Sequence, residues 1–584
     1  MIVLAAVLAI VPQMVRGNSC GHDFDFHLVS WLDALGNWRH GLFYPHWTAS
    51  ANYGAGEPRF IFYPPLTWML GAAMGIVLPW KIVPLALTSL LLAAAGLATR
   101  TLAREKFDDA VATLAGCTTV LSGYALFTAY ERSAFAELTG GFWFPLMLLF
   151  ALRNRIEDTP SDGAKRVPLV RRAFDGSALL LTLVVAGAWL SNAPVGVMLC
   201  YTLAAVALTT ALLGHSWAPL LRAATAVVLG IGLSAFYLVP AAWEQRWVAI
   251  QQATDDPGLL IENSWLFARH GDPRLEQHDI ELLRVSGIAV TMIAVALAGL
   301  LVTWWRKRLP AERKWWIPLG LVPVAVLFLQ LPFSRPIWNL LPELRFLQFP
   351  WRWLVALGTP MAIFFASALW TTNRWLRAFA LAVCAFVFLA AVAIAGVSFY
   401  QGCETEDSVR QRVEDYRAGT GFEGTDEYAP PHADNTLVAM ALPIACFVND
   451  PTVLLGQGDP DVTPLWSADQ HSCEATFPAA PSPGKTPSEH LAVAAETSHA
   501  GYLVLRQRTY PAWDVRVNGV PVTQMPERQD GLMAVPVPRG HVKVNVDWTA
   551  TRDFYVGRLI SGLAALLVTG LGLLEYRRFR PRLS

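Results

Sequence analysis

Long apolar segments dominate this sequence and limit what it can fold into. A helix that spans a bilayer needs about 20 predominantly apolar residues, and twelve segments approach or reach that length. The predicted crossings are residues 2–16, 80–103, 110–128, 139–153, 176–191, 194–213, 223–242, 286–305, 315–331, 351–370, 378–397 and 555–574. Because 54% of the residues are hydrophobic and only 15% are charged, a soluble fold could not cover these segments. The sequence predicts a polytopic α-helical membrane protein.

Lysine and arginine residues gather in three places outside the predicted crossings. They lie in the 153–175 loop, in the 306–314 loop and in the tail from Arg577. Short loops rich in these residues stay in the cytoplasm, and all three lie on one side if both termini are cytoplasmic. We therefore expect a multi-pass protein of the bacterial inner membrane whose other loops, and any active site in them, face the outside.

Two apolar segments allow a second interpretation. Counting residues 66–78 as a crossing would put the first loop on the same side as the basic 153–175 loop, so we predict a short helix at the outer surface there. Residues 2–15 could be a signal peptide. They lack a basic start and a small-x-small cleavage site before Gly17, and we predict an uncleaved helix.

The composition changes abruptly near Gln401. The chain beyond it is polar and rich in proline and glycine, and from Leu491 it contains short alternating apolar runs that are typical of strands. Asn518-Gly519 after one such run predicts a tight hairpin. The predicted parts are a transmembrane domain over 1–400 with its first outer loop at 17–79, a β-rich, sandwich-like outer domain over 401–553, and a last helix with a basic cytoplasmic tail over 554–584.

Charge and cysteine placement narrow the possible partners. The chain has 45 basic and 45 acidic residues, so nothing indicates a nucleic-acid partner. Cys20, Cys403, Cys446 and Cys473 fall in polar segments that we expect to face an oxidising compartment. They allow one or two disulfides and three pairings, among which the sequence does not choose.

Ionisable residues cluster where the first apolar segment ends and water begins. His22, Asp23, Asp25 and His27 lie within six residues, and in an extended segment the two aspartates would share one face. The structural alternative is that the aspartates solvate a loop and cap the following helix. That helix is predicted to be amphipathic and to lie in the membrane interface; its apolar repeat is Leu28, Trp31, Leu32, Leu35 and Trp38.

Aromatic rings follow these carboxylates in the turn over 54–65, which contains Glu57 and Tyr63. Rings beside carboxylates are typical of sites that handle sugars, because C–H faces of a sugar stack on rings while its hydroxyl groups bond to acidic partners. The turn therefore favours a carbohydrate substrate.

Several motifs resemble the GT-C superfamily of membrane glycosyltransferases. They are the first-loop Asp, Gly41-Leu42-Phe43-Tyr44-Pro45-His46-Trp47, Gly54-Ala55-Gly56-Glu57-Pro58 and Phe62-Tyr63-Pro64-Pro65-Leu66. Gln348-Phe349-Pro350-Trp351-Arg352 and the 510–519 segment are similar to bacterial membrane proteins labelled "6-pyruvoyl-tetrahydropterin synthase-related" and to the YfhO-like group. The resemblance covers nearly the whole chain. It implies transfer of a sugar from a polyprenyl-phosphate donor to an extracytoplasmic lipid, polysaccharide or protein.

The resemblance assigns Asp23 as the general base that takes the proton of the acceptor hydroxyl. Attack opposite the departing phosphate inverts the anomeric centre. Asp25 would hold the acceptor or orient Asp23, and two adjacent carboxylates raise each other's pKa. Glu137, near Arg132, matches the place of another acidic residue of the superfamily; the alternative is an exposed pair without function.

A departing phosphate needs a cation. Arg352 is the first choice, because a guanidinium binds phosphate through two parallel bonds; the alternative is that it only anchors the chain at the interface. Arg345 and Arg59 are further candidates. The predicted substrate-binding residues are His22, His27, Glu57, Tyr63, Arg132 and Trp351.

A divalent cation, Mg²⁺ or Mn²⁺, could lie between Asp23, Asp25 and Glu137, although a lipid monophosphate donor does not require one. Two other classes stay open: a transporter or flippase of lipid or polysaccharide, and a non-catalytic protein of envelope assembly. The predicted spans carry few charges in their middles, which favours chemistry at one face over a path through the membrane lipids.

Overall fold

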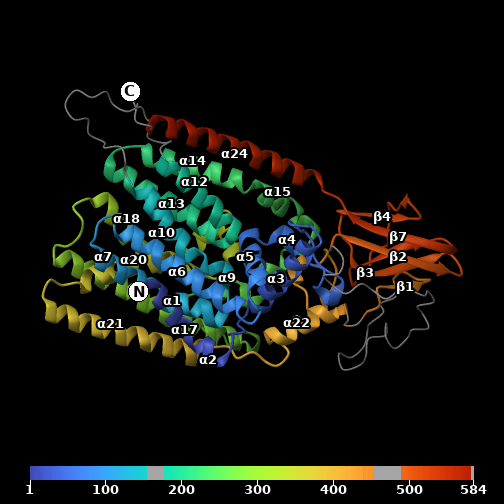
Figure 1. Cartoon of the computed structure of the whole chain (residues 1–584), viewed down its shortest axis with the longest axis horizontal. Coiled ribbons are helices and arrows are strands. Elements are labelled where there is room, and N and C mark those ends of the chain that lie inside the picture. Colours follow the sequence, from blue (N-terminus) through green and yellow to red (C-terminus); the bar gives the residue numbers. More distant parts are fainter. Residues whose placement is uncertain (154–175, 439, 441, 453–487, 580–584) are drawn as a thin grey trace.

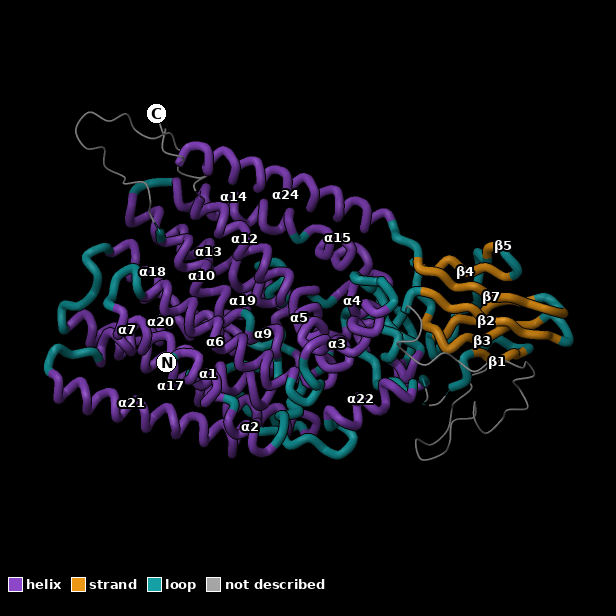
Figure 2. Tube along the Cα trace, viewed as in Figure 1, coloured by secondary structure: helices purple, strands orange, loops and turns teal. Residues whose placement is uncertain are grey.

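The computed structural model describes residues 1–153, 176–438, 440, 442–452 and 488–579. Its helices form one bundle, and its strands all lie beyond one end of that bundle (Figure 1). Figure 2 separates the helical body from the strand body by colour. The 154–175 part of the basic loop, and Cys473, lie outside the described residues.

Eight helices of the described chain are long and apolar enough to cross a membrane, and two bent helix pairs raise the number to ten. The single spans are Val83–Ala103, Asp109–Arg132, Phe135–Leu152, Ala193–Gly214, Pro273–Trp305, Pro350–Leu369, Arg374–Phe399 and Arg552–Arg577. The bent pairs are Ala218–Leu233 with Ala235–Trp247, and Arg313–Leu329 with Pro332–Leu340. These ten match ten of the twelve predicted crossings and confirm a polytopic helical membrane protein.

The helices that build this bundle and the outer loops have the following bounds. They are α3 Phe24–Arg39, α4 Arg59–Phe62, α5 Pro65–Val77, α6 Val83–Ala103, α7 Asp109–Val120, α8 Gly123–Phe127, α9 Phe135–Leu138, α10 Gly140–Leu152, α13 Ala193–Gly214, α14 Ala218–Leu233, α15 Ala235–Glu244, α16 Gln252–Asp255, α17 Glu276–Trp305, α18 Arg313–Leu329, α19 Arg335–Leu340, α20 Leu354–Leu369, α21 Arg374–Ile394, α22 Val409–Ala418 and α24 Arg552–Phe579.

Two predicted crossings differ from a full span. Residues 176–191 form α12 (Gly176–Ser191), which has 16 residues. The segment over 2–16 is divided into α1 (Ile2–Ala9) and α2 (Val11–Arg16). Pro12 lies at the start of α2, where it has no N–H to continue the preceding helix. The prediction of one continuous crossing over 2–16 is therefore wrong.

The basic loops meet at the end of the bundle that lies away from the strands. Arg153 pairs with Glu105 at 2.9 Å, and the next residue, Lys106, pairs with Glu312 at 2.6 Å. The C-terminal end of α24 also lies at this end (Figure 1). The described residues of the three basic segments are thus on one side, as the charge pattern predicted.

Seven strands form two antiparallel sheets, with orders β1-β3-β6 and β2-β7-β4-β5. Their bounds are β1 Ala445–Val448, β2 His490–Thr497, β3 Gly501–Arg508, β4 Trp513–Val517, β5 Val520–Pro521, β6 Leu532–Val537 and β7 Gly540–Trp548. Buried residues of both sheets share one core, which confirms the β-rich domain. Asn518 and Gly519, both at positive φ, join β4 to β5 and confirm the hairpin.

The first outer loop packs against this β domain. Trp47 is buried and lies 5.0 Å from the ring of Trp513. Gly56 follows at φ +76, and a Cβ there would lie 1.9 Å from the Trp47 indole nitrogen, so only glycine fits. A disulfide between Cys20 and Cys403 ties the start of the same loop to the segment after α21.

Helix α3 is buried on nearly all sides, which contradicts its predicted position in the membrane interface. Ser30, Asp33 and Asn37 on its polar face are as buried as its apolar residues. Asp33 accepts hydrogen bonds from the amide and hydroxyl of Ser50 at 3.1 and 2.5 Å. Other parts of the protein, rather than water, therefore satisfy the polar face. Helix α5 confirms the short helix predicted after Pro64-Pro65.

Candidate functional site

A cavity of about 630 Å³ lies between the helical bundle and the chain that leads to the β domain. One wall is mainly apolar and comes from α12, α13 and α15; it includes Trp189, Pro194, Val197, Leu238, Ala241 and Ala242. The other walls carry most of the polar side chains, including His22, Asp23, Glu137, Gln348, Arg352 and Glu427. The cavity is therefore amphipathic, with its apolar part on membrane-spanning helices.

Five predicted site residues line this cavity together: His22, Asp23, Tyr63, Glu137 and Arg352. They come from the start of α3, the turn before α5, the short helix α9 and the turn before α20. The fold thus brings together residues that are hundreds of positions apart.

Asp23 is held in place through its own backbone and that of its neighbours. Its N–H donates to the carbonyl of Arg132 at 2.9 Å, and its Oδ2 lies 3.7 Å from the Arg132 guanidinium. Gly21 fits against the same segment: a Cβ there would lie 2.3 Å from the carbonyl oxygen of Glu131. Arg132 and Gly21 therefore fix the direction in which the Asp23 carboxylate points.

Asp25 does not act beside Asp23. Helix α3 begins at Phe24, so the two aspartates are not in an extended segment, and Asp25 pairs with Arg412. Burial raises the pKa of Asp25. The charge of Arg412 opposes this rise, and the charge of Asp407 adds to it. The predicted pair of carboxylates on one face is wrong, because a helical turn separates side chains two positions apart.

Glu137 lies between two arginines. Its side chain is 4% exposed, and its Oε2 is 2.9 Å from Arg132 Nη1 and 3.4 Å from Arg352 Nε. The Tyr124 hydroxyl donates to the other oxygen. Glu137 is thus a buried, shared counter-ion, and the alternative of an exposed pair without contacts is wrong.

Arg352 is a buried cation that faces the cavity. The residue is 9% exposed, and its guanidinium lies over the ring of Phe349 at 5.2 Å. Its Nε is buried and has no hydrogen-bond partner among the described residues. Because Arg352 shares Glu137 with Arg132, its charge is only partly compensated. A guanidinium of this kind has donors left for an anion.

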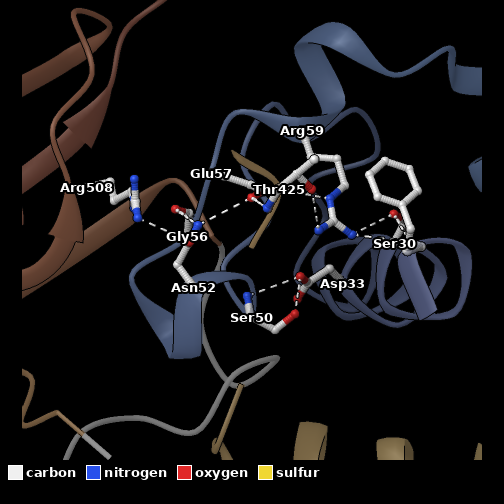
Figure 3. A network of polar contacts seen from close by, with 10 residues as sticks. Ser30, Asp33, Ser50, Asn52, Gly56, Glu57, Arg59, Thr425 and Arg508 are labelled. Carbon is white, nitrogen blue, oxygen red and sulfur yellow. Dashed lines mark hydrogen bonds and ion pairs between the residues drawn. The ribbon is translucent and has the colours of Figure 1, made fainter. Parts of the chain in front are cut away.

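Glu57 and Arg59 lie outside the cavity, in a buried network (Figure 3). Arg59 donates to Glu57 at 2.6 Å, to the Phe26 carbonyl at 3.2 Å and to the Ser30 hydroxyl at 3.2 Å. Glu57 also accepts from the amide and hydroxyl of Thr425, at 2.8 and 3.1 Å. These contacts fill both side chains. The predicted roles of Glu57 in substrate binding and of Arg59 in binding the donor phosphate are therefore wrong, and the pair instead holds Thr425 against α3.

The two histidines of the first motif differ in exposure. His22 lines the cavity and lies 3.9 Å from Glu281. His27 is 1% exposed and lies 3.5 Å from the Tyr63 hydroxyl. Burial lowers the pKa of His27 to about 4, with Asp23 opposing the shift. His27 is therefore neutral near pH 7 and supports Tyr63 from behind instead of binding substrate.

Three other predicted residues also do not line the cavity. Arg345 pairs with Glu262 at 2.5 Å on the surface. Trp351 is buried and stacks on Phe349 at 4.5 Å. Arg132 is buried behind the cavity wall, between the lining carboxylates. Arg345 and Trp351 are not placed to touch a substrate in the cavity, and Arg132 acts through its partners.

Sequence reasoning missed two groups of lining residues. Glu427 and Tyr428 come from the polar segment that was assigned as a whole to the β domain, where no motif marks them. Tyr237 and Gln245 come from α15 and the turn after it. Asn192 also lines the cavity, and its side chain accepts from the Val195 amide to cap α13.

The residues proposed for a divalent cation do not fit one. Asp25 pairs with Arg412, and Glu137 already accepts from Tyr124 and Arg132 and lies 3.4 Å from Arg352 Nε. Within the described ranges, no three His, Cys, Asp or Glu residues are close enough to hold a metal ion. The described residues therefore do not bring Asp23, Asp25 and Glu137 together into the Mg²⁺ or Mn²⁺ site that the sequence left possible.

Fold and site together define a class: a polytopic helical membrane protein with a domain of two antiparallel sheets at one end, and an amphipathic cavity between the helices and the chain that leads to that domain. The structure is similar to the Archaeoglobus fulgidus oligosaccharyltransferase complex with Zn and sulfate, at TM-score 0.39 and 15% identity over 69% of this chain and 54% of that one. The apo form gives TM-score 0.42 and 13% identity over 69% and 56%. Archaeal oligosaccharyltransferase AglB, in complex with an inhibitory peptide and a dolichol-phosphate, gives 0.40 and 14% over 69% and 56%.

The aligned part spans little more than half the length of that protein. No protein-family model matches the chain, and neither does any curated protein sequence. Membership of the narrower groups suggested by the motifs therefore stays a prediction.

Proposed function

We propose that this protein transfers a sugar from a polyprenyl-phosphate donor to a hydroxyl-bearing acceptor. The observation that carries the proposal is the cavity, which combines an apolar wall with a buried arginine and an open carboxylate, Arg352 and Asp23. A lipid-phosphate sugar has an apolar chain, an anion and a reactive carbon next to it. The chemistry of the cavity matches each of these parts.

Arg352 would bind the donor phosphate. Arg352 lines the cavity, and its shared counter-ion leaves positive charge available. As the bond to the phosphate breaks, negative charge grows on the leaving oxygen, and a fixed cation in a site of low dielectric stabilises that charge. The apolar residues of α12, α13 and α15 would hold the first part of the lipid chain.

Asp23 would act as the general base. The acceptor oxygen forms a bond to the anomeric carbon, its proton passes to the Asp23 carboxylate, and the electron pair of the broken C–O bond leaves on the phosphate. Attack from the side opposite the phosphate inverts the anomeric centre. Arg132, 3.7 Å from Asp23, orients the carboxylate.

The direction of the site in the membrane follows from the charge distribution. Arg153 and Lys106 mark the end of the bundle away from the strands. By the preference of basic loops for the cytoplasm, we propose that this end is cytoplasmic and that the cavity and the β domain face outside, in a bacterial inner membrane.

The test is incubation of the purified protein with polyprenyl-phosphate sugars and candidate acceptors. We expect Asp23→Asn to lower the transfer rate about 10²- to 10⁴-fold, while Asp514→Asn, on the outer domain, leaves it unchanged. Equal transfer rates for the wild type and Asp23→Asn would show that Asp23 is not the general base. Movement of the lipid across the vesicle membrane without product would support a transporter. The absence of both product and lipid movement would support an assembly protein.

A further inference from the structure

The segment Thr425–Tyr428 closes the cavity on the side of the β domain. Thr425, Glu427 and Tyr428 line it, although their chain belongs to the polar part after α21. Glu57 accepts from the Thr425 amide and hydroxyl, and the Tyr428 ring stacks on Phe62 at 5.4 Å with an interplanar angle of 18°. The turn is thus fixed to the first outer loop at both ends.

Glu427 differs from Asp23 and Glu137, the two other carboxylates inside the cavity. Asp23 lies beside Arg132, and Glu137 is bound by two arginines. Glu427 is half-buried, and with the other described residues it makes no ion pair and no side-chain hydrogen bond. Glu343, on the rim, is exposed. Its carboxylate accepts from its own backbone N–H, and its remaining acceptor sites are available to a ligand in the cavity that it lines.

The two walls of the cavity suit different substrates. A lipid-borne donor arrives through the bilayer, and the apolar wall lies on membrane-spanning helices. The Thr425–Tyr428 turn lies on the chain that connects α21 to the strands, which project beyond the bundle (Figure 1). That side is where a water-soluble compound enters.

We infer that the Thr425–Tyr428 turn forms the acceptor subsite and that the Glu427 carboxylate accepts a hydrogen bond from an acceptor hydroxyl group. This inference rests on the proposed sugar transfer. A carboxylate binds hydroxyl groups well and repels anions. Since Glu343 adds negative charge at the rim, the subsite takes a neutral carbohydrate in preference to one with uronic acids or phosphates near its reacting end.

The ionisation of Glu427 gives this subsite a pH dependence. Burial raises the pKa of Glu427 to about 7; the nearby charges of Glu57 and Asp426 add to the rise, and Arg59 opposes it. Below pH 7 the carboxyl group is neutral, and the charge-assisted bond to the acceptor is lost. Acceptor binding should therefore weaken between pH 8 and pH 6.

The experiment compares the wild type with Glu427→Gln. Glu423→Gln is the matched control, because Glu423 lies on the same segment but is exposed. The probes are glucose oligosaccharides and the matching glucuronic acid oligosaccharides, with binding measured by saturation-transfer NMR on the full protein in detergent. Loss of one hydrogen bond to a charged group should weaken binding of the glucose probe roughly 10- to 100-fold and abolish its pH dependence. The glucuronic acid probe should bind the variant better than the wild type.

Three results would each overturn the proposed acceptor subsite. They are equal binding of the glucose probe by the wild type and Glu427→Gln, no binding of that probe by the wild type, and a wild-type preference for the glucuronic acid probe. Donor turnover separates the two proposals. If the wild type transfers sugar but Glu427→Gln leaves the acceptor KM unchanged, the subsite fails and the function stands. If no donor is ever consumed while Glu427→Gln still weakens the glucose probe, the function fails and a carbohydrate-binding subsite stands.

Discussion

Replacing Glu57 by glutamine removes one charge from a buried ion pair and should destabilise the protein. Glu57 is 0% exposed and Arg59 is 3% exposed, with 2.6 Å between them. In Glu57→Gln the Arg59 cation stays buried without its counter-ion. Breaking a buried pair from one side costs about 3–5 kcal/mol. We expect the lower end, about 3 kcal/mol, because Arg59 keeps its contacts with Ser30 and the Phe26 ring.

The double substitution Glu57→Gln/Arg59→Met provides the matched control. It removes the cation as well as the anion, and replacing both partners of a buried pair is often nearly neutral. The double variant should therefore be more stable than Glu57→Gln alone, by about 2 kcal/mol. A purely local packing defect at position 57 would instead make the double variant worse than the single one.

The assay is unfolding by denaturant in detergent, followed by tryptophan fluorescence for the four members of the double-mutant cycle. Activity adds a second measurement, because the same carboxylate holds Thr425 against α3. Glu57→Gln should raise the acceptor KM more than the donor KM. A loss of stability below about 1 kcal/mol for Glu57→Gln, or additive effects in the cycle, would refute the account of this network.

Three further predictions test the first outer loop. Burial raises the pKa of Asp33 to about 6, with Ser50 opposing; between pH 5 and pH 8 the wild type should lose about 1.4 kcal/mol of stability relative to Asp33→Asn, and parallel pH–stability curves would disprove this. Gly21→Ala should strongly lower the rate of sugar transfer at near-normal expression, because the new Cβ meets the Glu131 carbonyl. The control for that rate measurement is Gly287→Ala, because Gly287 has open space around it. A reductant should lower the melting temperature of the wild type more than that of Cys20→Ser/Cys403→Ser, in which only the disulfide of Cys446 stays open to reduction, and the difference should correspond to about 2–5 kcal/mol; an equal effect on both would exclude the Cys20–Cys403 disulfide as the cause.

The membrane-spanning part of the fold could be predicted from local sequence because a bilayer demands long apolar helices. The same local rule failed for α3, where an apolar repeat and tryptophans suggested a surface helix. Its polar face is covered by Ser50 and by the Glu57–Arg59 pair. Only the tertiary structure supplies these partners, so no pattern within α3 could show that it is buried.

The candidate site, too, could be predicted only in part from the sequence. Asp23 lies in a motif of histidine, aspartate and phenylalanine residues, Arg352 lies in one with aromatic residues and a proline, and both line the cavity. Arg59 lies in an equally strong motif but serves the structure. Glu427 has no motif around it and lines the cavity all the same. A strong motif therefore indicates that a segment is structurally constrained. It does not indicate whether the segment lines the cavity, because that depends on contacts between distant segments.

A catalytic carboxylate on a loop needs more support than one on a rigid helix, since loops at a membrane surface are otherwise mobile. The first outer loop receives that support at separate points. The Cys20–Cys403 disulfide and the fit of Gly21 against Glu131 fix its start, and the Glu57 contacts fix its later part. Each anchor joins the loop to a different part of the chain. The position of Asp23 therefore depends on the bundle and on the chain before the strands together, and a change in either one should be felt at the cavity.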